Sequence, residues 1–214
     1  MDRKEHWEAV YGKKKSTEVS WYQAEPALSL SLVEQVIDAR PVSIIDVGGG
    51  TSSLVDHLVE RPQTTVSVLD LSGAALLEAK SRLGDTAATV NWIEGDILDI
   101  ELPHAAYDVW HDRAVFHFLT DPADRRRYVA QVLRSVRPGG HVLVATFDVD
   151  GPERCSGLQV ARYSPEELHA QFGRPFRLLR SVHENHTTPT GATQKFVYCL
   201  CSVEGPAIPA RVAS

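Results

Sequence analysis

Apolar residues along the chain gather in short strand-like runs separated by amphipathic stretches. Strand-like runs are predicted at residues 44–47, 64–70 and 90–94, from Tyr107 onward, and at 141–147, with helices between them at 54–59, 74–83 and 122–136. Strands that alternate with helices in this way build a parallel sheet with helices on both faces. The pattern therefore predicts an α/β fold.

Both ends of the chain depart from this alternation. A helix is predicted over residues 2–14 and a second from Ala27 to near Arg40, ahead of the first strand-like run. Near the C-terminus, Ser164 and Glu167 form the signature of a capping box that opens a further helix. Two extended runs follow at 176–184 and 194–202, and the link between them is too short for a crossover helix, so we expect an antiparallel pair.

We therefore predict a single domain over residues 1–203, made of an N-terminal helical arm (1–40) and a core (41–203), with a flexible tail at 204–214. The arm carries two aromatic pairs, Trp7 with Tyr11 and Trp21 with Tyr22. These rings either pack permanently on the domain or form a lid that covers a ligand.

Composition narrows the class of protein. The 214 residues are 43% hydrophobic and 23% charged, with a formal net charge of −6, which argues against a dedicated nucleic-acid binder. The basic run at 125–127 reads as a solvated helix face. Three cysteines indicate no disulfide framework, and no apolar run reaches transmembrane or signal-peptide character. We expect a cytoplasmic protein with neither nucleic-acid nor membrane partners, and its oligomeric state is not predicted.

The run from Ile44 to Ser53 is the strongest chemical signal. An apolar strand containing Asp46 leads into Gly48-Gly49-Gly50, which hydroxyl residues and a helix follow. Glycines permit positive φ angles and let a ligand approach the backbone, and the helix beyond them offers free N–H groups. A nucleotide-like ligand binds at this end of the first strand in open α/β sheets.

Two further acids follow the next two predicted strands. Asp70 ends the second strand, where an acid accepts the hydroxyls of a ribose, although it would also serve as a helix cap. Gly95-Asp96 follows the third strand, where the carboxylate is placed to accept an adenine amino group, with Leu71 or Ile97 against the ring.

These motifs resemble the class I S-adenosylmethionine-dependent methyltransferases. The resemblance covers about residues 5–202 and rests on the glycine motif, Asp70, Gly95-Asp96, the strand at 107–110 and the Arg137-Pro138-Gly139-Gly140 turn. It implies a Rossmann-like, doubly wound, mostly parallel seven-stranded sheet with a C-terminal antiparallel hairpin. It also implies that Asp46 and the glycine-turn backbone hold the methionine end of S-adenosylmethionine, which would leave as S-adenosylhomocysteine. Ser52 stands where the family often has Gly.

The spacing of Trp7, Tyr11 and Trp21 resembles a subgroup that includes some protein-lysine and small thiol or halide methyltransferases. The predicted cofactor-binding residues are Trp7, Tyr11, Trp21, Asp46, Gly48, Gly49, Gly50, Ser52, Asp70, Leu71, Gly95, Asp96, Ile97 and His111.

Catalytic candidates lie at the exit of the fourth strand. His111, Asp112 and Arg113 would stand nearest the methyl group, because strand-end residues line the ligand crevice in this architecture. A general base is needed only if the nucleophile arrives protonated. Cys155 is either a contact for a soft substrate or a small loop residue. The histidines at 111, 183 and 186 lack a recognised ligand motif, so no metal site is predicted.

The expected function is methyl transfer from S-adenosylmethionine to a small-molecule nucleophile: a thiol, metalloid, amine or carboxylate. A protein-lysine acceptor is the first alternative. From other classes, Gly48-x-Gly50 with Asp70 also fits an NAD-binding oxidoreductase, although Ser53 replaces its third glycine. A methyltransferase fold that binds the cofactor without catalysis is the remaining alternative.

Overall fold

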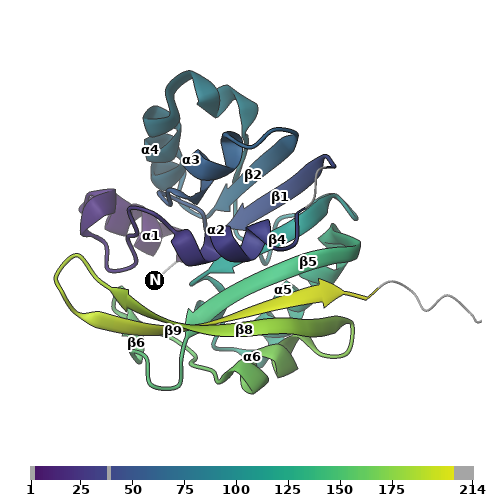
Figure 1. The fold of residues 1–214 in the computed structure, drawn as a ribbon. Helices are drawn as coiled ribbons and strands as arrows, with labels where there is room; N and C mark the ends of the chain where they lie inside the picture. The colour runs from purple at the N-terminus through teal and green to yellow at the C-terminus, as the bar shows by residue number, and fades with distance from the viewer. Residues whose placement is uncertain (1–2, 38–39, 205–214) are drawn as a thin grey trace, which may run out of the picture.

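The computed structural model describes residues 3–37 and 40–204, and Figure 1 shows a twisted sheet flanked by helices. The strands are β1 (Val42–Val47), β2 (Thr64–Asp70), β3 (Asn91–Glu94), β4 (Tyr107–Arg113), β5 (Val136–Phe147), β6 (Arg154–Cys155), β7 (Leu158–Gln159), β8 (Phe176–Thr187) and β9 (Thr193–Val203). The helices are α1 (Arg3–Tyr11), α2 (Ala27–Glu34), α3 (Leu54–Val59), α4 (Gly73–Leu83), α5 (Pro122–Ser135) and α6 (Pro165–Phe172), and the short 3₁₀ helices are η1 (Ser16–Glu18), η2 (Gly84–Thr89) and η3 (Phe116–Phe118).

The main sheet has seven strands in the order β3-β2-β1-β4-β5-β9-β8. Strand β1 pairs in parallel with both β2 and β4, and β9 runs antiparallel between β5 and β8. The predicted fold, a mostly parallel seven-stranded sheet closed by an antiparallel hairpin, is confirmed. The chain reverses its direction of travel across the sheet between β1 and β4, which creates a crevice at the carboxyl ends of these strands.

Hydrophobic layers fill both faces of the sheet, because neighbouring residues of a strand point to opposite sides. Ile44 packs in the layer beneath α2, α3 and α4, whereas Ile45 belongs to the layer beneath α5 and α6. Both side chains are fully buried. The sheet is therefore a rigid platform, and only its edge and its strand ends remain available for binding.

The predicted element boundaries differ from the structure in several places. The helix expected to reach Arg40 ends at Glu34, because the Val36 N–H bonds to the Val33 carbonyl three residues back and tightens the chain into a turn. Strand β5 begins at Val136 rather than His141, since Val136 already pairs with Tyr107 before a register shift. Strand β3 ends at Glu94, directly before Gly95-Asp96, as predicted. Apart from Glu204, the predicted tail lies outside the described residues.

The N-terminal arm is docked at two places. On α1, the Glu8 carboxylate accepts hydrogen bonds from the backbone N–H groups of Gly73 (2.8 Å) and Ala74 (3.4 Å) at the start of α4. Further along, His186 of the β8–β9 hairpin donates to the Ser20 carbonyl over 2.8 Å. In Figure 1 the arm accordingly lies between α4 and the tip of the hairpin.

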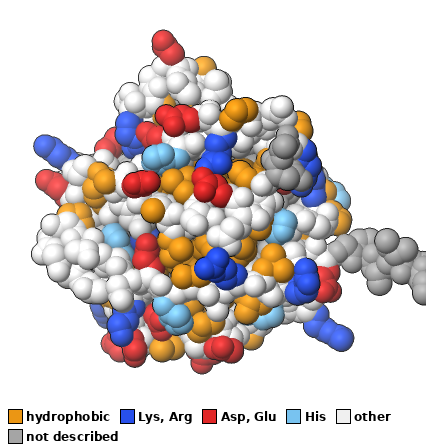
Figure 2. Space-filling view, viewed as in Figure 1, with side chains coloured by type: hydrophobic (Ala, Val, Ile, Leu, Met, Phe, Trp, Pro, Cys, Tyr) orange, Lys and Arg blue, Asp and Glu red, His pale blue; other side chains and the backbone are white. Residues whose placement is uncertain are grey.

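The surface mixes charges of both signs. On the face shown in Figure 2, the Lys and Arg side chains of the described chain lie interspersed with Asp and Glu. Among residues 3–37 and 40–204, no helix has both the length and the apolar character required to cross a bilayer.

Candidate functional site

Two adjoining cavities lie at the carboxyl ends of the central strands. The first has a volume of about 790 Å³ and the second about 530 Å³, each counted with the space open to solvent. Four residues line both cavities and so mark the place where they meet: Tyr11, Trp21, Gly48 and Arg113. The arm supplies two of these four residues, and therefore forms part of the wall.

Most of the predicted site residues line one cavity or both. The first cavity is lined by Trp7, Tyr11, Trp21, Gly48, Asp70, Leu71, Gly95, Asp96, Ile97 and Arg113. The second is lined by Tyr11, Trp21, Asp46, Gly48, Gly49, Ser52, His111 and Arg113. Gly50 and Asp112 line neither.

The glycine turn leaves no room for side chains. Gly48 and Gly50 have φ angles of 69° and 40°, which L-residues rarely adopt. A Cβ on Gly49 would lie 2.6 Å from the Asp46 Oδ2 atom, and one on Gly50 would lie 2.8 Å from the Asp70 Oδ2 atom. The turn thus packs the backbone directly against two buried carboxylates. Gly50 acts from behind the cavity wall and not as part of its lining.

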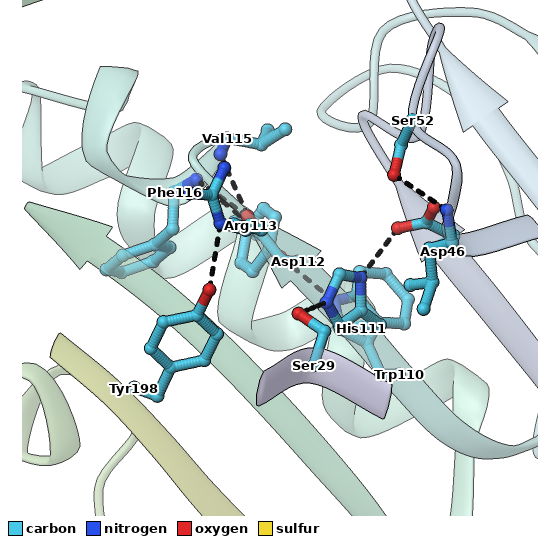
Figure 3. Close-up of polar contacts among 12 residues, drawn as sticks. Ser29, Asp46, Ser52, Trp110, His111, Asp112, Arg113, Val115, Phe116 and Tyr198 are labelled. Atoms are coloured by element: carbon cyan, nitrogen blue, oxygen red, sulfur yellow. Dashed lines mark hydrogen bonds and ion pairs between the residues drawn. The ribbon is translucent and has the colours of Figure 1, made fainter. Parts of the chain in front are cut away.

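Asp46 and His111 stand side by side because their strands pair at these two residues. The Asp46 Oδ1 atom lies 2.7 Å from His111 Nδ1, and His111 Nε2 lies 2.9 Å from the hydroxyl of Ser29, as Figure 3 shows. The Asp46 Oδ2 atom is buried without a hydrogen-bond partner among the described residues. Since a buried, unpaired carboxylate oxygen is costly, this atom is suited to receive a ligand donor.

Asp70 lies at the tip of β2 with only 6% of its surface exposed. Its Oδ1 atom accepts a 2.8 Å hydrogen bond from the Ser72 backbone N–H. Ser72, and not Asp70, caps α4, since its hydroxyl accepts from the Ala75 N–H. Burial, followed by the neighbouring charge of Asp46, raises the pKa of Asp70 to about 7, although the Ser72 N–H opposes this rise.

Asp112 is placed in the core and not at the cavity, which corrects its prediction as a catalytic candidate. Its carboxylate accepts from the backbone N–H groups of Val115 (2.8 Å) and Phe116 (3.1 Å) and from the Tyr128 hydroxyl. Because side chains alternate along β4, His111 and Arg113 face one side of the sheet and Asp112 the other. Its carboxylate therefore fixes the turn after β4.

Arg113, on β4, is held by two other parts of the fold, the arm and the C-terminal hairpin. Its Nε–H donates to the Tyr198 hydroxyl (2.8 Å), one Nη donates to the Trp21 carbonyl (3.2 Å), and the other lies 3.5 Å from Glu184. Figure 3 shows the Tyr198 contact. The guanidinium also lies over the Phe196 ring, 4.3 Å from its centroid. Arg113 thereby joins the arm, β4 and the C-terminal hairpin at the junction of the two cavities.

Cys155 and the two hairpin histidines have separate environments. Cys155 lines the first cavity, and burial raises the pKa of its thiol to about 12, so the thiol stays protonated at neutral pH. His183 bonds to Asp148, and His186 bonds to the Ser20 carbonyl. Within the part of the chain that the structure describes, no group of three His, Cys, Asp or Glu side chains is arranged to hold a metal ion.

Several residues of the site carry no sequence signal of their own. Ser29 on α2, Phe118 and Val115 after β4, and Glu184 and Tyr198 on the hairpin reach the site only through tertiary packing. Tyr198 and Glu184 lie on strands that the sequence predicts. The residues that these two side chains contact depend on the register between β8 and β9, which the sequence does not give.

Comparison with known proteins agrees with this geometry. Residues 44–140 match the family model described as a methyltransferase domain. Over this segment the chain is similar to the class I S-adenosylmethionine-dependent methyltransferases. The chain is 29% identical over 121 residues to the ubiquinone/menaquinone biosynthesis C-methyltransferase UbiE of Methylobacterium nodulans, an alignment that covers 54% of this chain and 47% of that protein. The chain spans about half the length of the curated relatives it matches.

Solved structures share the fold of this chain over nearly its whole length. One comes from work on the conversion of a disulfide bond into a thioacetal group during echinomycin biosynthesis, with a TM-score of 0.76, 17% identity and coverage of 95% of this chain and 92% of the other. Another is the N-methyltransferase NodS of Bradyrhizobium japonicum in complex with S-adenosyl-l-homocysteine, with a TM-score of 0.70, 14% identity and coverage of 95% and 100%. At these identities the likeness concerns the fold.

The raised pKa of Asp70 predicts a pH-dependent stability cost. The folded protein holds the Asp70 proton up to about pH 7, whereas the unfolded chain releases it near the usual value of 3.8. The associated stability is present below pH 4 and is lost as the pH rises through 7. Replacing Asp70 by Asn removes this loss. The difference in melting temperature between Asp70→Asn and the wild type should therefore increase by roughly 2 °C or more from pH 4 to pH 8. Thermal unfolding of ligand-free protein measures it, with Asp99→Asn as the exposed control. A difference that does not grow with pH would contradict the prediction.

Removal of the Asp112 carboxylate should destabilise the fold. Asp112→Ala leaves the Tyr128 hydroxyl and two buried N–H groups without their acceptor, so we expect a loss of about 3 kcal/mol in the free energy of unfolding. Urea denaturation measures this loss. Asp99→Ala, at an aspartate with a largely exposed side chain, should change the same quantity by less than about 0.5 kcal/mol. Equal, small losses for both variants would show that Asp112 is not a structural acceptor.

Proposed function

We propose that this protein transfers a methyl group from S-adenosylmethionine to a small-molecule nucleophile. The observation that carries the proposal is the series of acids along the two cavities: Asp46 on β1, Asp70 at the end of β2 and Asp96 after β3. The first cavity has the chemistry of an adenosine site and the second that of a methionine site, and they meet at the glycine turn.

The residues present fit this cofactor. The buried Asp46 Oδ2 lacks a partner among the described residues, and would accept from the amino group of the methionine end. Asp70 would accept from the ribose hydroxyls, and Asp96 from the adenine amino group. Leu71 and Ile97, both in the wall of the first cavity, would contact the adenine ring. A side chain on the glycine turn would clash with Asp46 and Asp70, so only glycine permits this close packing.

When bound, the cofactor supplies a methyl group activated by its sulfonium centre. The contribution of the protein is to orient the nucleophile and to exclude water. Trp7, Tyr11 and Trp21 form an aromatic cluster on the arm, with ring centroids 5.7 to 6.3 Å apart, and all three line the first cavity. This cluster covers the crevice and replaces water with apolar surface.

The acceptor that we propose is small, because Trp7, Tyr11 and Trp21 of the arm form part of the cavity wall and cover the crevice. The name of the relative UbiE describes C-methylation in ubiquinone and menaquinone biosynthesis, which supports methyl transfer to a small molecule as the reaction type. A protein-lysine acceptor is the second candidate, favoured by the open groove beside Tyr22 and Asn185 through which an extended side chain would approach.

Cofactor binding is the direct test. Titration calorimetry should detect binding of S-adenosylmethionine and S-adenosylhomocysteine to the wild type. Asp70→Ala should weaken both by about tenfold or more, because a charge-assisted hydrogen bond is worth about 1.5–3 kcal/mol. Asp99→Ala serves as the control. Binding of NAD without a response to either methionine derivative would overturn the proposal in favour of an oxidoreductase, and binding without methyl transfer to any cell extract would favour a non-catalytic cofactor-binding protein.

We further propose that the arm is a lid that tightens when the cofactor binds. Lys13, Lys14 and Lys15 are exposed, so trypsin should cut there, and S-adenosylhomocysteine should slow this cutting several-fold. Glu8→Ala, which removes the contact with α4, should speed cutting in the free protein, whereas Glu5→Ala, at an exposed position, should not. Cutting that is equally slow with and without the ligand would mean that the arm is a fixed part of the domain.

A further inference from the structure

We infer that the methyl acceptor is an anion, bound by Arg113 at the junction of the two cavities. This inference rests on the proposed function and adds the charge class of its substrate. The reacting methyl group lies between the adenosine and methionine halves of the cofactor. In this protein that place is the junction lined by Tyr11, Trp21, Gly48 and Arg113. Arg113 alone among these four carries a formal charge at neutral pH.

Arg113 has hydrogen-bonding capacity left for a ligand. A guanidinium offers five N–H donors, and three have partners among the described residues: the Tyr198 hydroxyl, the Trp21 carbonyl and Glu184. Two N–H groups remain on a side chain that lines both cavities. Paired N–H donors of arginine match the oxygens of an anionic group and bind it with directional specificity.

The charge partner of Arg113 is not part of the lining of either cavity. Glu184 stands 3.5 Å from the guanidinium but lines neither cavity. It also accepts hydrogen bonds from the Tyr198 hydroxyl and the Gln23 amide, each over 2.9 Å. Of this ion pair, only the positively charged side chain lines the junction of the cavities. Glu184 and Tyr198 act as positioning residues, because they fix the orientation of the guanidinium without reaching the ligand.

Among the described residues that line these cavities, no side chain is free to act as a general base, which also favours an acceptor that arrives unprotonated. Both ring nitrogens of His111 are engaged, by Asp46 and by Ser29. Cys155 is a buried thiol beside the cationic Arg113, and it is protonated at neutral pH. The carboxylates Asp46, Asp70 and Asp96 each line one cavity only, outside the junction, and are assigned to the cofactor.

The chemical step then balances without a base. A lone pair on the anionic acceptor, a carboxylate oxygen or a thiolate sulfur, forms a bond to the methyl carbon while the bond from that carbon to the sulfonium sulfur breaks. The electron pair of the broken bond stays on the sulfur as the neutral thioether of S-adenosylhomocysteine. The acceptor loses its negative charge, no proton is transferred, and the methyl ester or methyl thioether leaves the positively charged side chain.

The test separates acceptors by charge. A small-molecule extract of the cells that make the protein is divided on an anion exchanger into a retained and an unretained fraction, and each is incubated with the enzyme and methyl-labelled S-adenosylmethionine. Label should enter products of the retained fraction. The chemical class of the product, an ester cleaved by mild alkali or a stable thioether, distinguishes carboxylate from thiolate. Label that appears only with the unretained fraction, or in protein, would overturn the inference.

Variants test the role of Arg113 itself. Arg113→Gln should raise KM for the retained acceptor or lower kcat/KM by about 10- to 100-fold, while S-adenosylhomocysteine still binds within about threefold of the wild type. Arg113→Lys keeps the charge and should recover part of the activity. Tyr198→Phe removes one positioning contact and should raise KM more than it lowers kcat. Arg162→Gln, at an arginine that lines neither cavity, is the matched control.

The readouts keep the two proposals apart. Loss of S-adenosylhomocysteine binding by the wild type would refute the proposed function as a whole. If Arg113→Gln loses cofactor binding through misfolding, Arg113→Lys and Tyr198→Phe decide the question in its place. Unchanged kcat/KM for the retained acceptor in a variant that binds the cofactor normally would overturn the inference while the proposed function stands.

Discussion

The site depends on the parallel pairing of β1 with both of its neighbours. Register aligns Val47 with Leu69 of β2 and Asp46 with His111 of β4, so the ends of these strands meet at one edge. Buried hydrophobic layers on both faces hold this register, because a slip by one residue would turn each apolar side chain to the wrong face. The acids of the crevice are therefore placed by the core and not by contacts among themselves.

Because the core places them, several of these carboxylates are buried away from solvent. Asp46, Asp70 and Asp112 are all buried. The free-energy cost of burying a carboxylate is met differently in each of the three. Asp112 is satisfied by Tyr128 and two backbone N–H groups and belongs to the scaffold. Asp46 keeps one oxygen without a partner among the described residues, and Asp70 keeps a raised pKa. The unpartnered oxygen of Asp46 and the raised pKa of Asp70 make these two carboxylates suited to receive a ligand, whereas Asp112 is structural.

Much of the fold and of the candidate site followed from local sequence features. Strand-like runs, the glycine turn and acids that directly follow strands can each be recognised within a segment of about ten residues. Asp46, Asp70 and Asp96 were predicted from these local features. The end of α2 was wrong, since hydrophobic periodicity continues past the point where the backbone tightens. Asp112 was misplaced because a run of three polar residues does not say which face of the strand meets the ligand. The partners of Arg113 required the register of a hairpin about 70 to 85 residues away.

The contacts that hold the arm over the crevice also set an order of assembly. The carbonyl of Ser20 is fixed by His186, 166 residues later, and the side chain of Gln23 by Glu184, 161 residues later. A nascent chain thus completes its glycine turn and its acids early, and synthesises the segments that secure the cover last. Because contacts so distant in sequence carry a large loop-closure cost, the sheet must recruit the C-terminal hairpin before the arm can be fastened. Ser20 and Gln23 therefore reach these contacts only after the hairpin has been synthesised, whereas Glu8 of α1 finds its partners at the start of α4 much earlier in the chain.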